Sequence, residues 1–201
     1  MDNSQIHMEK IAEKTIHYYD LDGTLSTLNS TFDFIEGYLR HSNKFFRLYL
    51  TKIIMVTLMR TGNYDPYRSR NLVIILLFKG LQKSKLEKYF EEHYKKKFLN
   101  SLTPLGKELL ERPETADVLL TGCTEIPAKQ IALLFGFKTL ISTEFYYKKE
   151  KIDGIKTDTY GSNKSRFLEK GGDRTVYYTD DLDSEKSLIP LMDEIVEVKY
   201  P

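Results

Sequence analysis

Two aspartates separated by one residue are the best candidates in this sequence for catalysis. Asp20 and Asp22 follow a run of strand-forming residues, Thr15–Tyr19, and come just before Gly23. Because glycine allows a sharp backbone turn, this segment can bring both carboxylates and the neighbouring N–H groups to one rim. Such a rim suits a carboxylate nucleophile, an acid or base beside it, and a hard metal ion.

Short apolar runs and helical patterns alternate in the second half of the chain. Strands are expected at Thr15–Tyr19, Val118–Leu120, Thr139–Ile141, Val176–Tyr178 and Ile195–Val198. Helices are expected at Ile126–Phe135, Lys164–Glu169 and Glu185–Met192, and a hairpin over Phe145–Tyr160 with its turn at Asp153–Gly154. This alternation predicts an α/β fold, a Rossmann-like parallel sheet covered on both faces.

The first strand is separated from the others by a long block of helical patterns. Apolar residues recur at helical spacing over Thr31–Leu39, Phe45–Met59, Asn71–Leu77 and Lys85–Phe98. The first strand must pair with strands that come after this block, so the block is an insertion. We therefore expect a discontinuous core domain of residues 1–25 and 112–201, with a helical domain of residues 26–111 inserted into it.

Polar residues follow each core strand and should meet at one edge of the sheet, where open parallel sheets form their sites. Besides the two aspartates, they are Thr121 and Gly122, then Lys164, and finally Asp180 with Asp181 and Asp183. This set suits phosphoryl transfer, which needs an in-line nucleophile, donors for the phosphate oxygens and cations for their charge.

Each of these residues can be given a role in that chemistry. Asp20 would attack phosphorus, and Asp22 would protonate the leaving oxygen and then activate water. The phosphate would be bound by Thr121, by the N–H groups of Leu21 and Gly122, and by Lys164. Asp20, Asp180 and the backbone carbonyl of Asp22 would hold Mg²⁺, an ion that prefers oxygen ligands.

Four segments, in this order, resemble the motifs of the haloacid dehalogenase (HAD) superfamily, in particular its phosphoserine-phosphatase-like branch, subfamily IB. They are Asp20–Leu25, Leu119–Gly122, Lys164 within Gly161–Lys164, and Thr179–Leu182. The resemblance covers nearly the whole chain. It implies a Rossmann-like core with a helical cap, dependence on Mg²⁺ and an aspartyl-phosphate intermediate.

Two positions depart from the pattern of this branch. Ser184 stands where many relatives have a further aspartate, so Asp181 or Asp183 is expected to support the metal site instead. Asn29 stands where phosphoserine phosphatases have the glutamate that reads the amino group of their substrate. Phosphoserine itself is therefore not the expected substrate.

The helical insert leaves the substrate open. A small phosphorylated metabolite is the leading expectation. The apolar residues between Phe45 and Leu58 also suit a lipid phosphate such as phosphatidylglycerophosphate at a membrane surface, although ordinary helix packing is the commoner explanation for them. Arg60, Arg68 and Arg70 could meet a second anionic group, and a catalytically idle binding module is the alternative from another class.

The composition sets the remaining limits. The 201 residues carry 30 Lys and Arg against 29 Asp and Glu, so no general attraction to nucleic acid is expected. A single cysteine fits a reducing compartment, and residues 1–14 lack the apolar segment of a secretion signal. These features predict a cytoplasmic protein. They make no prediction about its oligomeric state.

Overall fold

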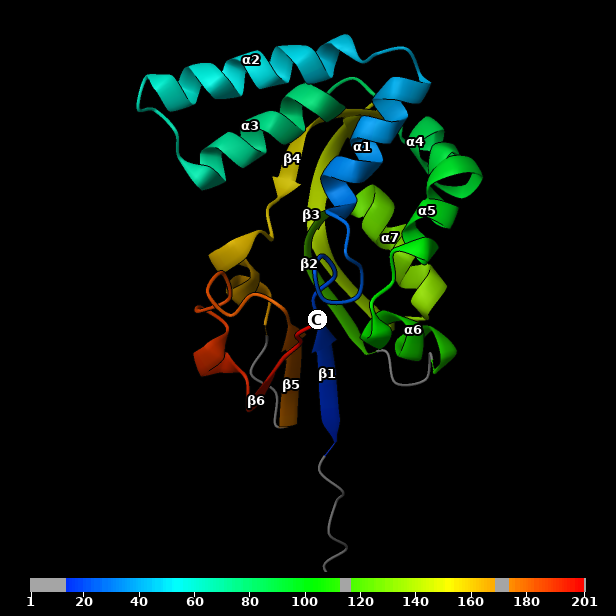
Figure 1. Cartoon of the computed structure of the whole chain (residues 1–201), viewed down its shortest axis with the longest axis vertical. Helices are drawn as coiled ribbons and strands as arrows, with labels where there is room; N and C mark the ends of the chain where they lie inside the picture. Colours follow the sequence, from blue (N-terminus) through cyan, green and yellow to red (C-terminus); the bar gives the residue numbers. More distant parts are fainter. Residues whose placement is uncertain (1–13, 113–116, 169–173, 201) are drawn as a thin grey trace, which may run out of the picture.

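The computed structural model describes residues 14–112, 117–168 and 174–200. Over these residues the chain is an α/β fold with a six-stranded sheet in the order β4-β3-β2-β1-β5-β6 (Figure 1). The strands are β1 (Thr15–Tyr19), β2 (Val118–Thr124), β3 (Thr139–Lys148), β4 (Lys151–Thr157), β5 (Arg174–Thr179) and β6 (Glu194–Glu197). All neighbours are parallel except β3 and β4. The predicted fold class is confirmed, with β1 between β2 and β5.

The helices of the insert follow β1 directly, and one more helix follows β2. They are α1 (Ser30–His41), α2 (Phe46–Arg60), α3 (Pro66–Phe78), α4 (Lys83–Tyr89), a π-helical turn (Phe90–Tyr94), α5 (Lys95–Asn100), α6 (Pro104–Glu111) and α7 (Glu125–Phe135). Asn29, Asp65 and Thr103 begin three of them, because each side chain accepts a hydrogen bond from a backbone N–H of the first turn.

Side chains alternate along the central strands and build a core on each face of the sheet. Tyr19 and Leu119 belong to a large cluster beneath the helices, whereas Tyr18 and Leu120 belong to a smaller cluster on the other face. The large cluster continues into the inserted helices through Phe34, Ile74, Phe90 and Phe98. Buried side chains thus join the sheet to the insert, and the division at residues 25 and 111 stays a prediction.

Two predicted helices are not α-helices in the structure. The first is a 3₁₀ helix over Gly161–Phe167, and the predicted end at Glu169 lies outside the described residues. The second is a series of turns with a short 3₁₀ helix at Ile189–Leu191. Pro190 explains the second case, because proline has no N–H to donate and disfavours the α conformation in the residue before it.

The predicted hairpin forms, but its turn is not at Asp153–Gly154. The turn residues are Lys149 and Glu150, with φ of 49° and 62°, the positive values that a tight hairpin turn requires. Gly154 instead lies in β4 and pairs with Tyr146. This register buries Phe145 on β3 and Ile152 on β4, and that burial outweighs the local preference of Asp-Gly for a turn.

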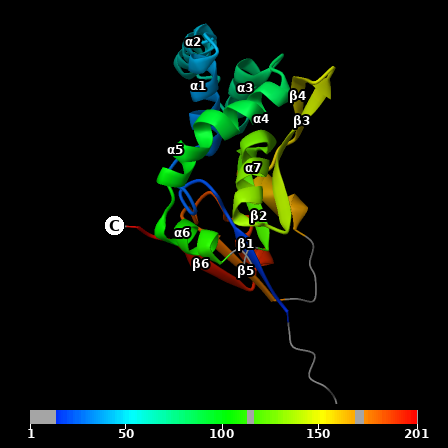
Figure 2. The same cartoon turned by 90° about the vertical axis from the view of Figure 1, so that its right-hand side faces the viewer.

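Helices α2 and α3 form an arm at one end of the molecule. They pack against each other and extend past the sheet, while α4 to α7 lie along one of its faces (Figures 1 and 2). Arg47 on α2 fastens the pair by donating to the carbonyl oxygens of Leu77 and Lys79. Within the described residues, no helix is both long and apolar enough to span a bilayer.

Candidate active site

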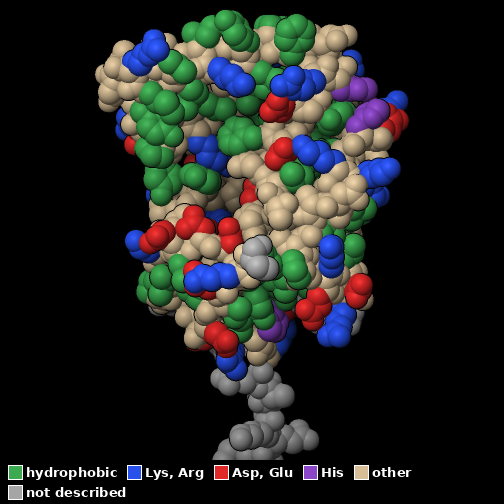
Figure 3. All heavy atoms as spheres, viewed as in Figure 1, with side chains coloured by type: hydrophobic (Ala, Val, Ile, Leu, Met, Phe, Trp, Pro, Cys, Tyr) green, Lys and Arg blue, Asp and Glu red, His purple; other side chains and the backbone are tan. Residues whose placement is uncertain are grey.

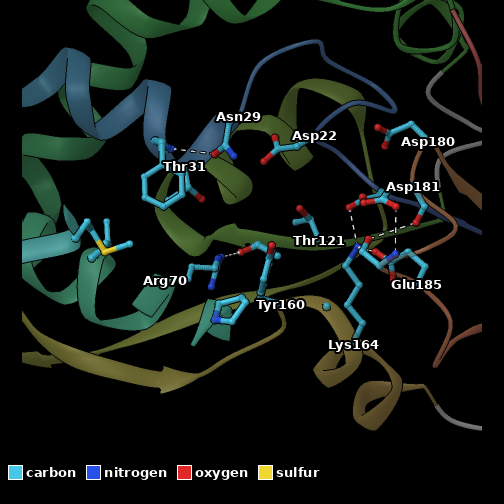
Figure 4. Close-up of a pocket in the computed structure, with 18 of the residues that line it drawn as sticks. Asp22, Asn29, Thr31, Arg70, Thr121, Tyr160, Lys164, Asp180, Asp181 and Glu185 are labelled. Carbon is cyan, nitrogen blue, oxygen red and sulfur yellow. Dashed lines mark hydrogen bonds and ion pairs between the residues drawn. The ribbon is translucent and has the colours of Figure 1, made fainter. Parts of the chain in front are cut away.

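The carboxyl ends of β1, β2 and β5 meet beside a cavity of about 380 Å³. The predicted residues that line it are Asp20, Asp22, Thr121, Gly122, Lys164, Asp180 and Asp181. Figure 4 shows Lys164, Glu185 and the aspartates toward one end, with Arg70 and Tyr160 toward the other. The sheet therefore brings together residues that lie up to 165 positions apart in the chain, between Asp20 and Glu185.

The turn after β1 fits closely around Asp180. Gly23 has φ of 83°, and a Cβ at this position would overlap the Asp180 carboxylate. The Thr24 hydroxyl donates to Asp180 Oδ1 over 3.0 Å and accepts from the Asp180 N–H over 2.9 Å. Glycine at position 23 is thus required twice, by the backbone conformation and by the approach of a carboxylate.

Asp22 lies in the turn after β1, and its side chain reaches the start of α1. There its Oδ1 accepts a hydrogen bond from the N–H of Ser30, the first residue of that helix, over 2.9 Å. Burial raises the pKa of Asp22 to about 7, even though the hydrogen bond from Ser30 acts in the opposite direction. The nearby charge of Asp20 adds to the increase in pKa. A carboxyl group with this pKa can both give and take a proton near neutral pH.

Lys164 is buried, and its ammonium group makes three contacts at the rim. Nζ lies 2.9 Å from Asp20 Oδ1, 3.0 Å from the Tyr177 hydroxyl and 2.5 Å from Glu185 Oε1. Burial by itself would lower the pKa of Lys164, but the charges of Asp20 and Glu185 hold it well above its ordinary value. Lys164 is therefore a fixed cation next to one oxygen of Asp20.

Glu185 and Tyr177 were not among the predicted site residues. Glu185 is 2% exposed, and burial raises its pKa while the charge of Lys164 opposes that change. Its second oxygen, Oε2, has no hydrogen-bond partner among the described residues. The sequence offered one signal for Glu185, an acidic residue directly after Ser184. Tyr177 gave no signal, because a tyrosine in a buried strand is ordinary core packing.

The two predicted supporting residues, Asp181 and Asp183, have different surroundings. Asp181 borders the cavity, and its Oδ1 accepts from the backbone N–H groups of Asp183 and Ser184, each over 3.1 Å. Asp183 points to solvent, where its carboxylate pairs with Lys186 at 2.8 Å. The structure thus brings Asp181 to the site but leaves the side chain of Asp183 outside it.

The predicted metal ligands provide two carboxylates and one backbone oxygen. Burial raises the pKa of Asp180, and the charge of Asp20 raises it further. Burial thus favours the neutral form of the Asp180 carboxyl, and a bound cation would favour its ionised form. No cluster of three or more His, Cys, Asp or Glu side chains suited to a metal occurs in the described residues. Asp20, Asp180 and the Asp22 carbonyl nevertheless offer oxygen donors of the kind that Mg²⁺ prefers, and this ion usually keeps several waters as its other ligands.

The phosphate-binding candidates Thr121, Gly122 and Leu21 lie in the second half of β2 and in the turn after β1. Thr121 Oγ1 accepts from the Cys123 N–H over 3.0 Å, which leaves its hydroxyl hydrogen available to a ligand. Gly122 lines the cavity with its backbone. The side chain of Leu21 is fully buried in the core, so only its main chain can serve the site.

Arg70 on α3 is held at the other end of the cavity. Its guanidinium donates to the Gly122 carbonyl, lies 3.4 Å from Asp158 Oδ1 and stacks 4.3 Å from the centre of the Tyr160 ring. Burial lowers its pKa from the usual value. Of the three arginines considered in the sequence, only Arg70 lines the cavity, whereas Arg60 and Arg68 are exposed.

Comparison with known proteins supports this architecture. Residues 18–182 match the family model described as haloacid dehalogenase-like hydrolase. No sequence among the curated proteins matches the chain significantly.

Solved structures share the fold at low sequence identity. A protein of unknown function from Bordetella pertussis Tohama I has a TM-score of 0.68 and 14% identity, over 92% of this chain and 90% of that one. A substrate-bound phosphoserine phosphatase has a TM-score of 0.58 and 18% identity, over 91% and 85%. A phospho-aspartyl intermediate analogue of phosphoserine phosphatase has a TM-score of 0.56 and 17% identity, over 93% of this chain and 95% of that one.

Proposed function

Because this chain belongs to the haloacid dehalogenase-like hydrolases, we propose that it is a Mg²⁺-dependent phosphomonoesterase that works through an aspartyl-phosphate. The observation that carries the proposal is the contact of 2.9 Å between Lys164 Nζ and Asp20 Oδ1 at the rim of the cavity. This contact fixes one oxygen of Asp20. It leaves Oδ2 as the attacking atom.

The proposed reaction has two steps. In the first, Asp20 Oδ2 bonds to phosphorus, the bond from phosphorus to the ester oxygen breaks, and the departing oxygen takes a proton from Asp22. In the second, Asp22 takes a proton from water, whose oxygen attacks phosphorus and frees Asp20 and inorganic phosphate. The pKa of about 7 for Asp22 suits both transfers.

The remaining residues stabilise charge during both steps. Thr121 and the backbone N–H groups of Leu21 and Gly122 would donate to the phosphate oxygens, and Lys164 would offset their charge. Asp20, Asp180 and the Asp22 carbonyl would hold Mg²⁺, which supplies further charge neutralisation when bound. Glu185 and Tyr177 would position Lys164 through the contacts described above.

The walls of the cavity support a role for the inserted helices in substrate choice. Met55, Tyr64, Pro66 and Val73 line it from the arm, whereas the charged residues other than Arg70 come from segments that follow the strands. We assign residues 26–111 as a cap on a core of residues 1–25 and 112–201. A small phosphorylated metabolite suits the volume. The apolar wall also favours a second candidate, a phosphate ester with a lipid-like portion.

A third candidate, an idle binding module, is disfavoured by the site. The proposed nucleophile, Asp20, is in contact with Lys164. Ser184 stands where many relatives have a carboxylate, but the next residue, Glu185, supplies a buried carboxylate that contacts Lys164. The cytoplasm is the proposed location, on the basis of the single cysteine, Cys123, which is buried as a free thiol.

The test is a phosphatase assay with p-nitrophenyl phosphate and Mg²⁺. We expect Asp20→Asn to lower kcat by about 10⁴-fold or more, because it removes the nucleophile. The matched control is Asp153→Asn, a carboxylate that is exposed on β4. The control should keep wild-type turnover. Equal turnover in wild type and Asp20→Asn would refute the proposed nucleophile.

A further inference from the structure

Helix α2 has apolar residues on every side, but the described part of the molecule covers only one side of it. Its buried residue is Thr51, and Met55, one turn further on, lines the cavity. On the opposite side five large apolar residues recur at helical spacing, each between 45% and 70% exposed: Phe46, Tyr49, Leu50, Ile53 and Val56. We call these five residues the outer face of α2. A helix that is apolar all round normally lies inside a protein or against lipid.

The chain segment that carries this face has charges of a single sign. Between Asn43 and Tyr64 the chain carries Lys44, Arg47, Lys52 and Arg60 and no acidic residue. In the described part of the chain none of these four side chains pairs with a carboxylate. Figure 3 shows hydrophobic side chains with Lys and Arg among them at the top of the molecule, over α2 and α3, while acidic side chains gather below the hollow.

We propose that the outer face of α2 docks on an anionic lipid bilayer. The helix would lie in the plane of the interface, with its apolar residues among the acyl chains and its cations at the headgroups. Lys52 and Arg60 flank the apolar residues, and their long side chains can reach outward to phosphates. An interfacial helix of this kind does not span the bilayer, which agrees with the limited length of α2.

A second copy of the chain would suit the same face less well. A two-fold contact places the same patch of each molecule against the other. The cations Lys44, Lys52 and Arg60 of one copy would then lie against the same positively charged patch of the other, with no acidic residue of the same segment to balance them. Anionic headgroups remove this repulsion, so the charge pattern favours lipid over self-association.

The position of α2 would bring a docked bilayer close to the cavity of the candidate active site. Met55 lines the cavity from the side of α2 that is opposite to the outer face. A helix is only about 10 Å across. A docked bilayer would therefore lie about one helix diameter from the cavity. This consequence rests on the proposed function, whereas docking itself does not need hydrolysis.

The test is co-sedimentation of the full chain with vesicles of equal parts phosphatidylcholine and phosphatidylglycerol. The wild type should sediment with them, and it should bind much less to pure phosphatidylcholine or at high salt. The double variant Leu50→Glu with Ile53→Glu should bind about tenfold less or weaker still, because it loses two apolar contacts and gains two repelled charges.

The matched control adds the same two charges elsewhere. Leu133 on α7 and Ile189 in the C-terminal turns are exposed apolar residues outside the arm. Leu133→Glu with Ile189→Glu should keep wild-type binding. Both double variants should keep wild-type turnover of p-nitrophenyl phosphate, so a failure of docking is distinguished from a failure of the proposed chemistry.

Three results would overturn the proposal. They are absence of wild-type binding to anionic vesicles, equal binding by the outer-face variant, and equal loss in the two double variants. A fourth is a wild-type dimer in sedimentation velocity that the outer-face variant abolishes, because a second copy would then be the occupant of this face.

Discussion

The rim of the cavity and the outer face of α2 place side chains against their usual preference, in opposite directions. At the rim, Lys164 and Glu185 are charged and buried. On α2, Tyr49 and Ile53 are apolar and exposed. Both placements are costly for a protein that only has to fold. The cost at the rim is offset by contacts inside the molecule, whereas on α2 none of the described residues offsets it.

This difference separates two kinds of functional surface. At the rim, the buried cation of Lys164 contacts two carboxylates, those of Asp20 and Glu185. The outer face of α2 has no partner among the described residues. The first kind is tested by removing an internal contact, and the second by changing what surrounds the protein.

The largest expected effect follows from replacing the cation of the rim. Lys164→Met leaves Asp20 and Glu185 buried without their counter-charge, and we expect a loss of about 3–5 kcal/mol in the free energy of unfolding. Urea titration followed by circular dichroism measures it. Lys186→Met is the control, since Lys186 forms an exposed pair with Asp183 and should cost at most about 1 kcal/mol. Similar losses in both variants would remove the contrast between buried and exposed charge.

An intermediate effect is expected from Gly23→Ala. Its Cβ would overlap the Asp180 carboxylate, whereas a Cβ on Gly62, which has φ of 69°, would meet open space. Both variants share the backbone strain of a positive φ, of order 1 kcal/mol. Only Gly23→Ala should also displace Asp180, and we expect kcat to fall about 100-fold. Steady-state kinetics at saturating Mg²⁺ checks it, and an equal kcat in the two variants would show that the approach to Asp180 does not matter.

The smallest effect is expected on α2. Ile53→Ala should change the free energy of unfolding by no more than about 0.5 kcal/mol, because the side chain is exposed. The same change at Ile74, which is fully buried on α3, should cost about 2–5 kcal/mol. Thermal and urea unfolding of both variants give the comparison. A large loss at Ile53 would mean that its side chain stabilises the fold itself.

Much of the site could be predicted because its candidate residues lie in short sequence motifs. The pair Asp20 and Asp22 before Gly23 predicts a rim of carboxylates at a turn. The strand patterns then predict which later residues join it, since parallel strands end on one edge of the sheet. Thr121, Lys164 and Asp180 follow from this rule, and the structure brings all three to the cavity.

Other features could not be predicted, because they depend on contacts between distant segments. The Asp-Gly pair at 153–154 favours a turn locally, but the burial of Phe145 and Ile152 sets the register of the hairpin. Glu185 lies in a segment with a helical pattern, yet the segment forms turns and its carboxylate reaches Lys164. Arg70 lines the cavity while Arg68, two residues earlier, is exposed, and spacing alone does not separate them.

The sequence by itself determined the α/β class, the helices between the first two strands and the candidates for the reacting groups, because periodicity and glycine placement are local properties. Only the tertiary structure decided which buried charges pair and which apolar helix face remains uncovered. Pairing and exposure depend on what packs against each residue, and the partners come from segments far away in the chain.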